Sequence, residues 1–187
     1  FINSPEGGTG YDKKDREAGG NGYVPIPLQY GKYTALYARD PSIAGGDPLE
    51  EFVNRTYKNK TVISSNHYDL SMVTDTRKRM KNKPVIVCVN LSKPMVFAEF
   101  EKEADAIMAS FDVQEQVLFD LMTGGAEPSG LLPFQMPADM KTVEEQKEDV
   151  PHDMECYRDS EGNIYDFAYG MNWQGVISDG RTQRYKK

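Results

Sequence analysis

The strongest strand signal in this sequence is the octapeptide Lys83-Pro84-Val85-Ile86-Val87-Cys88-Val89-Asn90. Its five apolar residues are mostly β-branched, and the proline before them favours the end of any preceding helix. A continuous apolar run of this kind is typical of a strand that is covered on both faces, as in parallel sheets. We therefore expect a buried strand over residues 85–89.

Segments on either side of this run continue a pattern of alternating helix and strand. A helix is predicted from Ser65 or Asn66, either of which can cap it, to about Lys81. Its last turn carries Arg77-Lys78-Arg79, which suits the negative end of the helix dipole. A second covered strand is predicted over residues 106–111, after a crossover segment.

A further helix is predicted directly after the second strand. Asp112 is a favourable N-cap, and Glu115 follows three residues later, as in a capping box. Gly124 or Gly125 then supplies the left-handed position that commonly follows a helix. The sequence from Gly124 to Pro137 therefore predicts a helix stop, a tight turn and a short closing strand.

Together these segments predict an α/β fold: a three-layer open sheet with helices on both faces. We expect one domain over residues 1–187, with a long glycine-rich functional loop region over residues 3–60. The α/β core covers residues 61–137, and residues 138–187 form an irregular tail with a hairpin. Because the chain opens on what reads as the end of a strand, we expect further strands upstream in a longer protein. Ligands of such sheets bind at the carboxyl ends of the strands, here near Asn90 and Asp112.

The composition disfavours several classes of function. A net charge of −7 disfavours nucleic acid, and no apolar run approaches the roughly 20 residues that span a bilayer. The two histidines lie far apart without paired cysteines, so no metal is expected, and no other cofactor either. The glycines of residues 7–10 lack the Gly-Lys-Ser/Thr of a phosphate-binding loop. Cys88 and Cys156 are predicted to be free thiols, with Cys88 buried.

A series of sequence blocks carries a family resemblance. The blocks are KPVIVCVN (83–90), ADAIMASF (104–111), QEQ (114–116), EPSGLLP (127–133) and YDFAYGMNW (165–173). In this order and spacing they resemble the C-terminal α/β sandwich domain of family 3 glycoside hydrolases, the β-glucosidase and β-xylosidase family. The last block is similar to the family's aromatic closing motif.

The resemblance implies a retaining glycoside hydrolase that cleaves β-linked glucosides or xylosides. In this family an N-terminal (β/α)8 barrel carries the nucleophilic aspartate, and no such barrel fits in 187 residues. In many members the C-terminal domain lends a loop that brings the acid/base glutamate to the mouth of the barrel. The second carboxyl group must lie roughly 5 to 5.5 Å from the nucleophile. The resemblance places this loop between Asn3 and Pro27.

Two glutamates are candidates for the acid/base residue. Glu17 comes first, because Glu17-Ala18-Gly19-Gly20-Asn21-Gly22-Tyr23-Val24-Pro25-Ile26-Pro27 resembles the arrangement in some members. Glu6 comes second, and Asp12, Asp15 or the absence of an acid/base residue are the remaining alternatives. Other members place a glutamate directly before a Gly-Tyr/Phe-Asp-Arg run, but Thr9 precedes Gly10-Tyr11-Asp12 here. This departure leaves a non-catalytic carbohydrate-binding or scaffolding module as the alternative function.

The resemblance also implies which residues and partners accompany the acid/base group. Tyr11, Asp12 and Tyr23 are the expected substrate-binding residues. The tyrosines from Tyr23 to Tyr37, and Trp173, can stack on sugar rings or pack the loop onto the domain, and both alternatives stay open. The expected partners are a carbohydrate substrate and the barrel of the same protein, with nucleic acid and membranes excluded and a homodimer left open. The chain alone is expected to be inactive.

Overall fold

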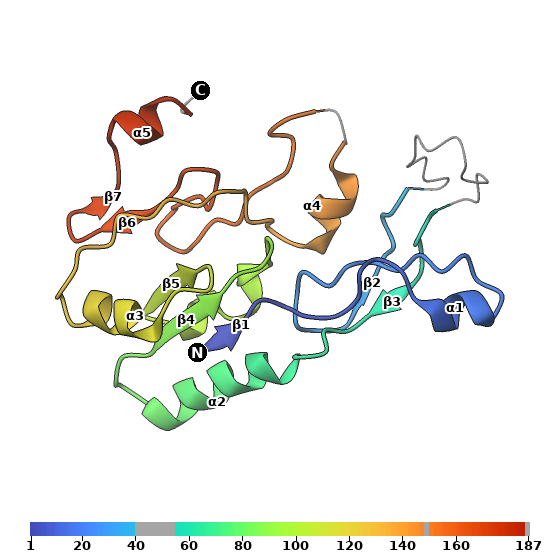
Figure 1. The fold of residues 1–187 in the computed structure, drawn as a ribbon, viewed down its shortest axis with the longest axis horizontal. Helices are drawn as coiled ribbons and strands as arrows, with labels where there is room; N and C mark the ends of the chain where they lie inside the picture. The colour runs from blue at the N-terminus through green and yellow to red at the C-terminus, as the bar shows by residue number, and fades with distance from the viewer. Residues whose placement is uncertain (40–54, 148–149, 186–187) are drawn as a thin grey trace.

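A parallel sheet of three strands forms the centre of the structure. The computed structural model describes residues 1–39, 55–147 and 150–185 (Figure 1). The strands β1 (Ile2–Asn3), β4 (Ile86–Asn90) and β5 (Ala106–Ser110) lie in the order β1-β4-β5, and all pairs are parallel. The sheet is open, so the α/β fold class is confirmed together with both predicted strands.

Two helices cover opposite faces of this sheet. Val87 and Val89 pack in the core with Val73 of α2 (Tyr68–Met80), while Cys88 lines a cavity with Leu118 of α3 (Glu115–Met122). Because successive residues of a strand point to opposite faces, α2 and α3 lie on different sides. The covering is incomplete, since Ile86 remains 42% exposed. The prediction of a strand covered along both faces therefore holds only for its second half.

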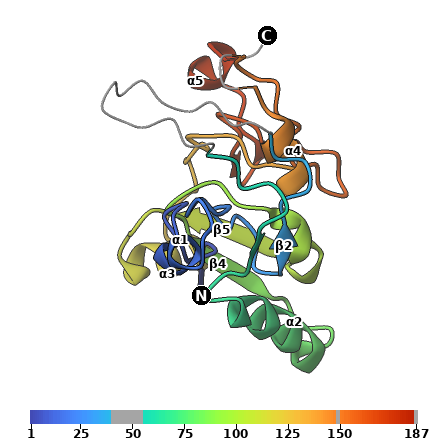
Figure 2. The same cartoon turned by 90° about the vertical axis from the view of Figure 1, so that its right-hand side faces the viewer.

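The remaining elements are short and lie around the sheet. They are α1 (Lys13–Glu17), β2 (Tyr33–Thr34), β3 (Thr61–Val62), the 3-10 helices η1 (Phe97–Glu99) and η2 (Glu101–Glu103), α4 (Met140–Glu145), β6 (Met171–Asn172), β7 (Gly175–Val176) and α5 (Gly180–Gln183). β2 pairs with β3, and β6 with β7, both antiparallel. Figures 1 and 2 place α2 on one side of the sheet and the tail, with α4 and α5, on the other. Residues 40–54 of the predicted loop region lie outside the described residues.

The two predicted capping interactions are wrong. His67 takes the N-cap position of α2 without a side-chain bond, while the Asn66 amide accepts from Glu6 N at 2.7 Å and donates to Asp69 Oδ2 at 2.9 Å. At α3 the N-cap is Gln114, and Asp112 turns away with a φ of 51°. Asn66 thus bonds to the chain just after β1, and Asp112 bonds to Asn90 at the end of β4, instead of capping the helices. The basic last turn of α2 is confirmed.

The predicted closing strand after α3 is also wrong. Gly124 does adopt the left-handed conformation, with a φ of 79°, but the residues that follow form no strand. They bond instead to the tail: Leu132 N donates to Tyr169 O at 2.7 Å, and Met136 N donates to Tyr165 O at 2.9 Å. The tail hairpin is present as a single bridge between Arg158 and Ile164.

A close approach of two glycines explains one motif residue. A Cβ atom on Gly170 would lie 2.1 Å from the carbonyl oxygen of Gly130, which no side chain can tolerate without a backbone shift. Gly170 belongs to the aromatic closing block, and Gly130 to the Pro-Ser-Gly block. Two of the blocks that carry the family resemblance therefore meet in space, and their close approach requires glycine at position 170.

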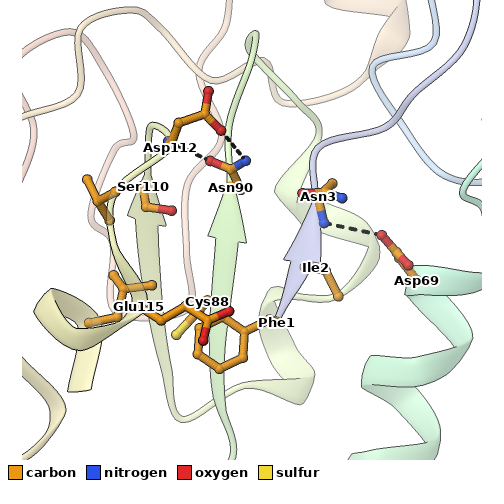
Figure 3. A pocket seen from close by; sticks show the side chains of 11 residues that line it. Phe1, Ile2, Asn3, Asp69, Cys88, Asn90, Ser110, Asp112 and Glu115 are labelled. Atoms are coloured by element: carbon orange, nitrogen blue, oxygen red, sulfur yellow. Dashed lines mark hydrogen bonds between the residues drawn. The ribbon is translucent and has the colours of Figure 1, made fainter.

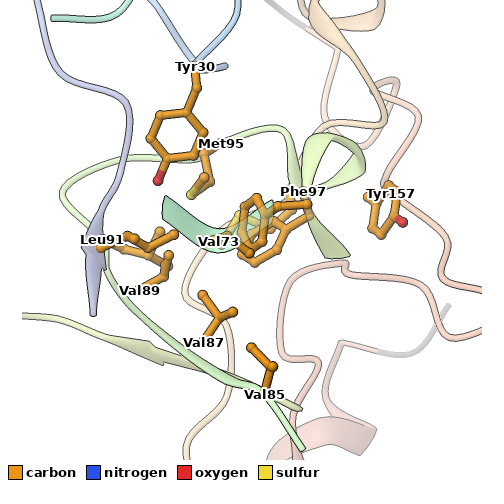
Figure 4. Packing of buried hydrophobic residues seen from close by; sticks show 12 residues of the cluster. Tyr30, Val73, Val85, Val87, Val89, Leu91, Met95, Phe97 and Tyr157 are labelled. Atoms are coloured by element: carbon orange, nitrogen blue, oxygen red, sulfur yellow. The ribbon is translucent and has the colours of Figure 1, made fainter. Parts of the chain in front are cut away.

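One hydrophobic core joins these distant parts of the chain (Figure 4). Its buried members are Ile2, Tyr30, Val73, Val85, Val87, Val89, Leu91, Met95, Phe97, Phe100, Met136 and Tyr157. Phe97 contributes contacts to Phe100 and to Tyr165 of the tail, each with ring centroids 5.5 Å apart.

None of the helices in the described ranges is long and apolar enough to cross a membrane. Both cysteines are free and Cys88 is buried, as predicted.

A pH-dependent contact joins the start of β4 to α2. Asp105 Oδ2 accepts from Val85 N at 2.7 Å and from Arg77 Nη2 at 2.6 Å. These bonds, the backbone one first, hold the pKa of the Asp105 carboxyl below its usual range. A carboxyl group with a lowered folded-state pKa stabilises the fold above its unfolded pKa, and the contribution disappears as the pH falls through the folded pKa.

We expect Asp105→Asn to lower the free energy of unfolding at pH 7, since the charge that Arg77 binds is removed. The difference between this variant and the wild-type chain should shrink as the pH falls below about 4, the usual range of an aspartate. Urea unfolding of both proteins between pH 7 and pH 3 measures it. A difference that is constant over this range would show that the Asp105 charge does not contribute.

Candidate functional site

The carboxyl ends of the three parallel strands border a cavity of about 440 Å³ (Figure 3). The strand register places Asn3, Asn90 and Ser110 in one row across β1, β4 and β5. The cavity is lined by Phe1, Ile2, Asn3, Asp69, Cys88, Asn90, Ser110, Asp112, Val113, Glu115 and Leu118. The position predicted for a ligand, near Asn90 and Asp112, is therefore a real recess.

Asn90 and Asp112 form a reciprocal pair at its rim, which Figure 3 shows as two dashed lines. Asn90 Nδ2 donates to Asp112 Oδ1 at 2.8 Å, and Asp112 N donates to Asn90 Oδ1 at 2.9 Å. The left-handed backbone of Asp112 allows this geometry, and aspartate tolerates it better than most residues. The pair fastens the end of β5 to the end of β4, so both side chains have a structural role.

Two side chains of the cavity lining that could take part in hydrolysis, Asp69 and Cys88, are poorly suited to it. The carboxylate of Asp69 accepts from Asn3 N at 3.2 Å, which leaves this acid occupied by the backbone. Burial raises the pKa of the Cys88 thiol, so the unreactive protonated form persists at neutral pH. Within the described ranges, no group of three or more His, Cys, Asp or Glu side chains is placed to hold a metal ion. None of the predicted catalytic or substrate-binding residues lines the cavity.

The predicted acid/base loop forms a separate, ordered feature built around α1. Asp12 is the N-cap of this helix, and its Oδ1 accepts from Lys14 N at 2.8 Å. Glu17 is the last residue of α1, with a side chain that is 64% exposed. Its carboxylate forms an ion pair with Lys13, one turn earlier, at 3.6 Å and mostly in water. Exposed pairs of this kind contribute little, so the carboxyl group of Glu17 is available.

Tyr11 and Tyr23 lie together at the base of the loop. They form an isolated antiparallel bridge, and their rings meet edge to face with centroids 5.9 Å apart. Gly22 makes this possible, because a Cβ atom there would lie 2.4 Å from Cε2 of Tyr11. Tyr11 is still 48% exposed. The structure thus brings two of the predicted substrate-binding residues together and leaves one aromatic face accessible.

Asp15 is bound by neighbours that hold its carboxyl group in the charged form. Its Oδ2 lies 2.6 Å from Lys60 Nζ and accepts from Gly22 N at 2.7 Å. These two bonds, with Lys60 the larger cause, lower the pKa of Asp15. A general acid must carry a proton near neutral pH, which this environment opposes. Because Asp12 caps a helix and Asp15 binds Lys60, neither suits the alternative role considered for it.

Glu6 lies on a different part of the scaffold, just after β1. Its backbone N donates to Ser64 Oγ at 2.9 Å and to Asn66 Oδ1 at 2.7 Å, and its side chain is exposed. Burial lowers the pKa of the nearby Lys93, an effect that the negative charge of Glu6 opposes. Glu6 is therefore held at its backbone by two side chains of a distant segment. No sequence signal pointed to Lys60, since its contact with Asp15 joins segments that are 45 residues apart.

Comparison with known proteins identifies the domain. The profile of the Glycosyl hydrolase family 3 C-terminal domain matches residues 50–173. The chain belongs to this family. The match covers β4, β5, α3 and most of the tail, so these elements are those of a family 3 C-terminal domain. The loop with Glu6 and Glu17 lies N-terminal to the matched residues.

Curated relatives extend this result. Beta-glucosidase C of Emericella nidulans is 32% identical over 91 residues, which cover 49% of this chain and 14% of the relative. Periplasmic beta-glucosidase/beta-xylosidase of Dickeya chrysanthemi is 30% identical over 88 residues, 47% of this chain and 12% of the relative. The matched part of the family 3 domain thus spans well under a fifth of these enzymes. No solved structure matches the chain significantly.

Proposed function

We propose that this family 3 domain is the C-terminal part of a retaining β-glucosidase or β-xylosidase, called here the two-domain enzyme. Its partner is a (β/α)8 barrel in the same polypeptide, which carries the nucleophile and binds most of the sugar. The small share of the relatives that the chain matches is consistent with such a partner. The proposed substrate class is that of these relatives, a beta-glucosidase and a beta-glucosidase/beta-xylosidase.

The acid/base residue in this proposal is Glu17. The observation that supports this assignment is that the neighbouring carboxyl groups already have structural roles. Asp12 caps the helix and Asp15 binds Lys60, whereas Glu17 projects from the last turn into solvent. A barrel that covers α1 would bring this carboxyl group to the anomeric centre. There it would protonate the leaving oxygen and later activate the water molecule that hydrolyses the glycosyl-enzyme.

Tyr11 supports the same proposal as a sugar contact. Its ring packs edge to face against Tyr23 and occupies the space that Gly22 leaves by having no side chain. Nearly half of Tyr11 is nevertheless exposed. A rigid, accessible aromatic ring suits the apolar face of a sugar, because little side-chain entropy is lost on binding. We place Tyr11 on the leaving-group side of the bond that is cleaved, with Asp12 and Tyr23 supporting the loop.

Substitution of Glu17 and Glu6 in the two-domain enzyme tests the proposal. Glu17→Gln should remove most of the hydrolysis of a β-glucoside, because it keeps the shape of the side chain and removes the transferable proton. An unaltered rate in this variant would exclude the acid/base role of Glu17 and favour a non-catalytic module. A loss confined to Glu6→Gln would instead assign the role to Glu6.

The chain by itself should not hydrolyse an aryl β-glucoside. In the family the nucleophile comes from the barrel, and retaining hydrolysis needs two carboxyl groups held roughly 5 to 5.5 Å apart. Release of the aryl group by the purified chain, followed by absorbance, measures this. Turnover above the buffer control would refute the division of the catalytic residues between two domains.

A further inference from the structure

Lys60 connects the acid/base loop to the pair of strands β2 and β3. Its Nζ lies 2.6 Å from Asp15 Oδ2 and 2.6 Å from Asn21 Oδ1. The side chains of Lys60 and Asp15 are 23% and 26% exposed, against 84% and 64% for Lys13 and Glu17. A charge-assisted bond that is partly shielded from water is stronger than an exposed ion pair. Lys60 therefore holds the loop more firmly than the contact that Glu17 itself makes.

The loop closes tightly around the carboxyl group that Lys60 binds. Gly22 N donates to Asp15 Oδ2 at 2.7 Å, and Gly20 N donates to Asp15 O at 2.9 Å. A Cβ atom on Gly20 would lie 2.2 Å from Asp15 Oδ2, so only glycine fits there without displacing the carboxylate. Tyr23 N completes the turn by donating to Asn21 Oδ1 at 3.1 Å. Residues 15–23 thus form one closed turn.

Lys60 itself stands on a fixed backbone. Ala35 N donates to Lys60 O at 2.9 Å, and the next residue, Thr61, pairs with Thr34 in the β2–β3 ladder. By contrast, α1 has no buried residue and gains nothing from apolar packing. Together with the bridge between Tyr11 and Tyr23 and the bond from Asn21 Nδ2 to Thr56 O at 2.8 Å, the polar bonds to Lys60 therefore hold α1 in place.

We propose that Lys60 is a positioning residue that fixes α1, and with it Glu17, through Asp15. This inference rests on the proposed function of Glu17. Displacing a catalytic group by about 1 Å can cost on the order of a hundredfold in rate. Removal of the Lys60 ammonium frees α1 to move and should lower the rate without removing any group that touches the substrate.

A double-mutant cycle in the two-domain enzyme tests this role. Lys60→Met should lower kcat about 10- to 100-fold on a β-glucoside with a poor leaving group, with less change in KM. In the Glu17→Gln background the same substitution should cost no more than about twofold, because a missing acid cannot be misplaced. Asp15→Asn is a second variant that breaks the same contact and should show the same non-additivity. Lys58→Met, two residues away and exposed, is the matched control and should keep the wild-type kcat.

The outcomes separate the two proposals. If Glu17→Gln keeps the wild-type rate, the proposed function fails and the positioning role fails with it. If Glu17→Gln is impaired but Lys60→Met and Asp15→Asn are not, or if their losses add to that of Glu17→Gln, only the positioning role fails. Hydrogen exchange on the purified chain gives an independent readout: the amides of Gly22 and Tyr23 should exchange faster in Lys60→Met, and unchanged exchange would overturn the inference.

Discussion

The Glu17→Gln variant of the two-domain enzyme is expected to hydrolyse an alkyl β-glucoside about 10²- to 10⁴-fold more slowly than the wild type, the usual contribution of a general acid or base. The reason is that an alkoxide leaves only when its oxygen receives a proton in the transition state. An aryl glucoside with an acidic phenol needs no such help in the first step. Its loss in kcat/KM, which reports on this first step, should therefore be far smaller, although kcat also falls because the variant lacks the general base for the second step. Steady-state kinetics on a series of leaving groups measures the difference.

A matched substitution controls for nonspecific effects. Glu127 is an exposed glutamate in the turn after α3, far from α1 in sequence, and Glu127→Gln should keep the wild-type rate for every leaving group. If Glu17→Gln lowered kcat/KM for alkyl and aryl substrates by the same factor, its role would be binding or folding rather than proton transfer. A steep dependence in Glu6→Gln and none in Glu17→Gln would move the acid/base role to Glu6.

The Phe100→Ala variant is expected to lose about 3–5 kcal/mol of unfolding free energy, the usual cost of deleting a buried phenylalanine ring. Phe100 is 1% exposed and contacts Tyr30 and Phe97, with ring centroids 6.3 and 5.5 Å apart. It thus lies where the N-terminal loop meets the crossover between β4 and β5. Urea unfolding of the purified chain, followed by tyrosine fluorescence or circular dichroism, measures the loss.

Phe119→Ala is the matched control for this core substitution. Phe119 lies on α3, is 46% exposed and has one ring neighbour, Phe1, at 6.1 Å. Its removal should cost less than about 1 kcal/mol, because nearly half of its surface is already in water and little further area is lost from the core. Equal losses in the two variants would contradict the placement of the core between the loop and the crossover.

Local sequence patterns were sufficient to predict the framework of the fold. The β-branched run before Asn90 forms β4, residues 106–110 form β5, and the basic residues after Asp75 end α2. Each of these signals acts within a few residues of the element that it specifies. The same holds for Gly124, whose left-handed backbone ends α3 as expected.

Predictions failed where a distant partner competes with a local one. Asp112 has the sequence context of an N-cap, but Asn90, 22 residues away, offers it two hydrogen bonds. The segment up to Pro137 looks like a strand, yet its backbone groups bond to Tyr165 and Tyr169 of the tail. Such choices depend on which chain segments meet, and no local pattern encodes that.

In the candidate site, too, local sequence predicted some residues, while a contact between distant segments was not predicted. The loop sequence suggested Glu17, Tyr11 and Tyr23, and the structure places the two tyrosines together and the glutamate at the exposed end of a helix. The role of Glu17 remains a proposal. The lysine that holds the loop, Lys60, is 45 residues from Asp15 and lies next to a strand of two residues. Nothing in the sequence around it indicates that contact.

Rescue of Glu17→Gln by azide tests the central claim most directly. Azide attacks the glycosyl-enzyme without giving up a proton, so it does not need the general base that the variant lacks. With an activated aryl β-glucoside, added azide should raise the turnover of Glu17→Gln severalfold and yield the β-glycosyl azide, while the wild-type enzyme is unaffected. An absence of both acceleration and glycosyl azide in Glu17→Gln would contradict the assignment of the acid/base role to Glu17.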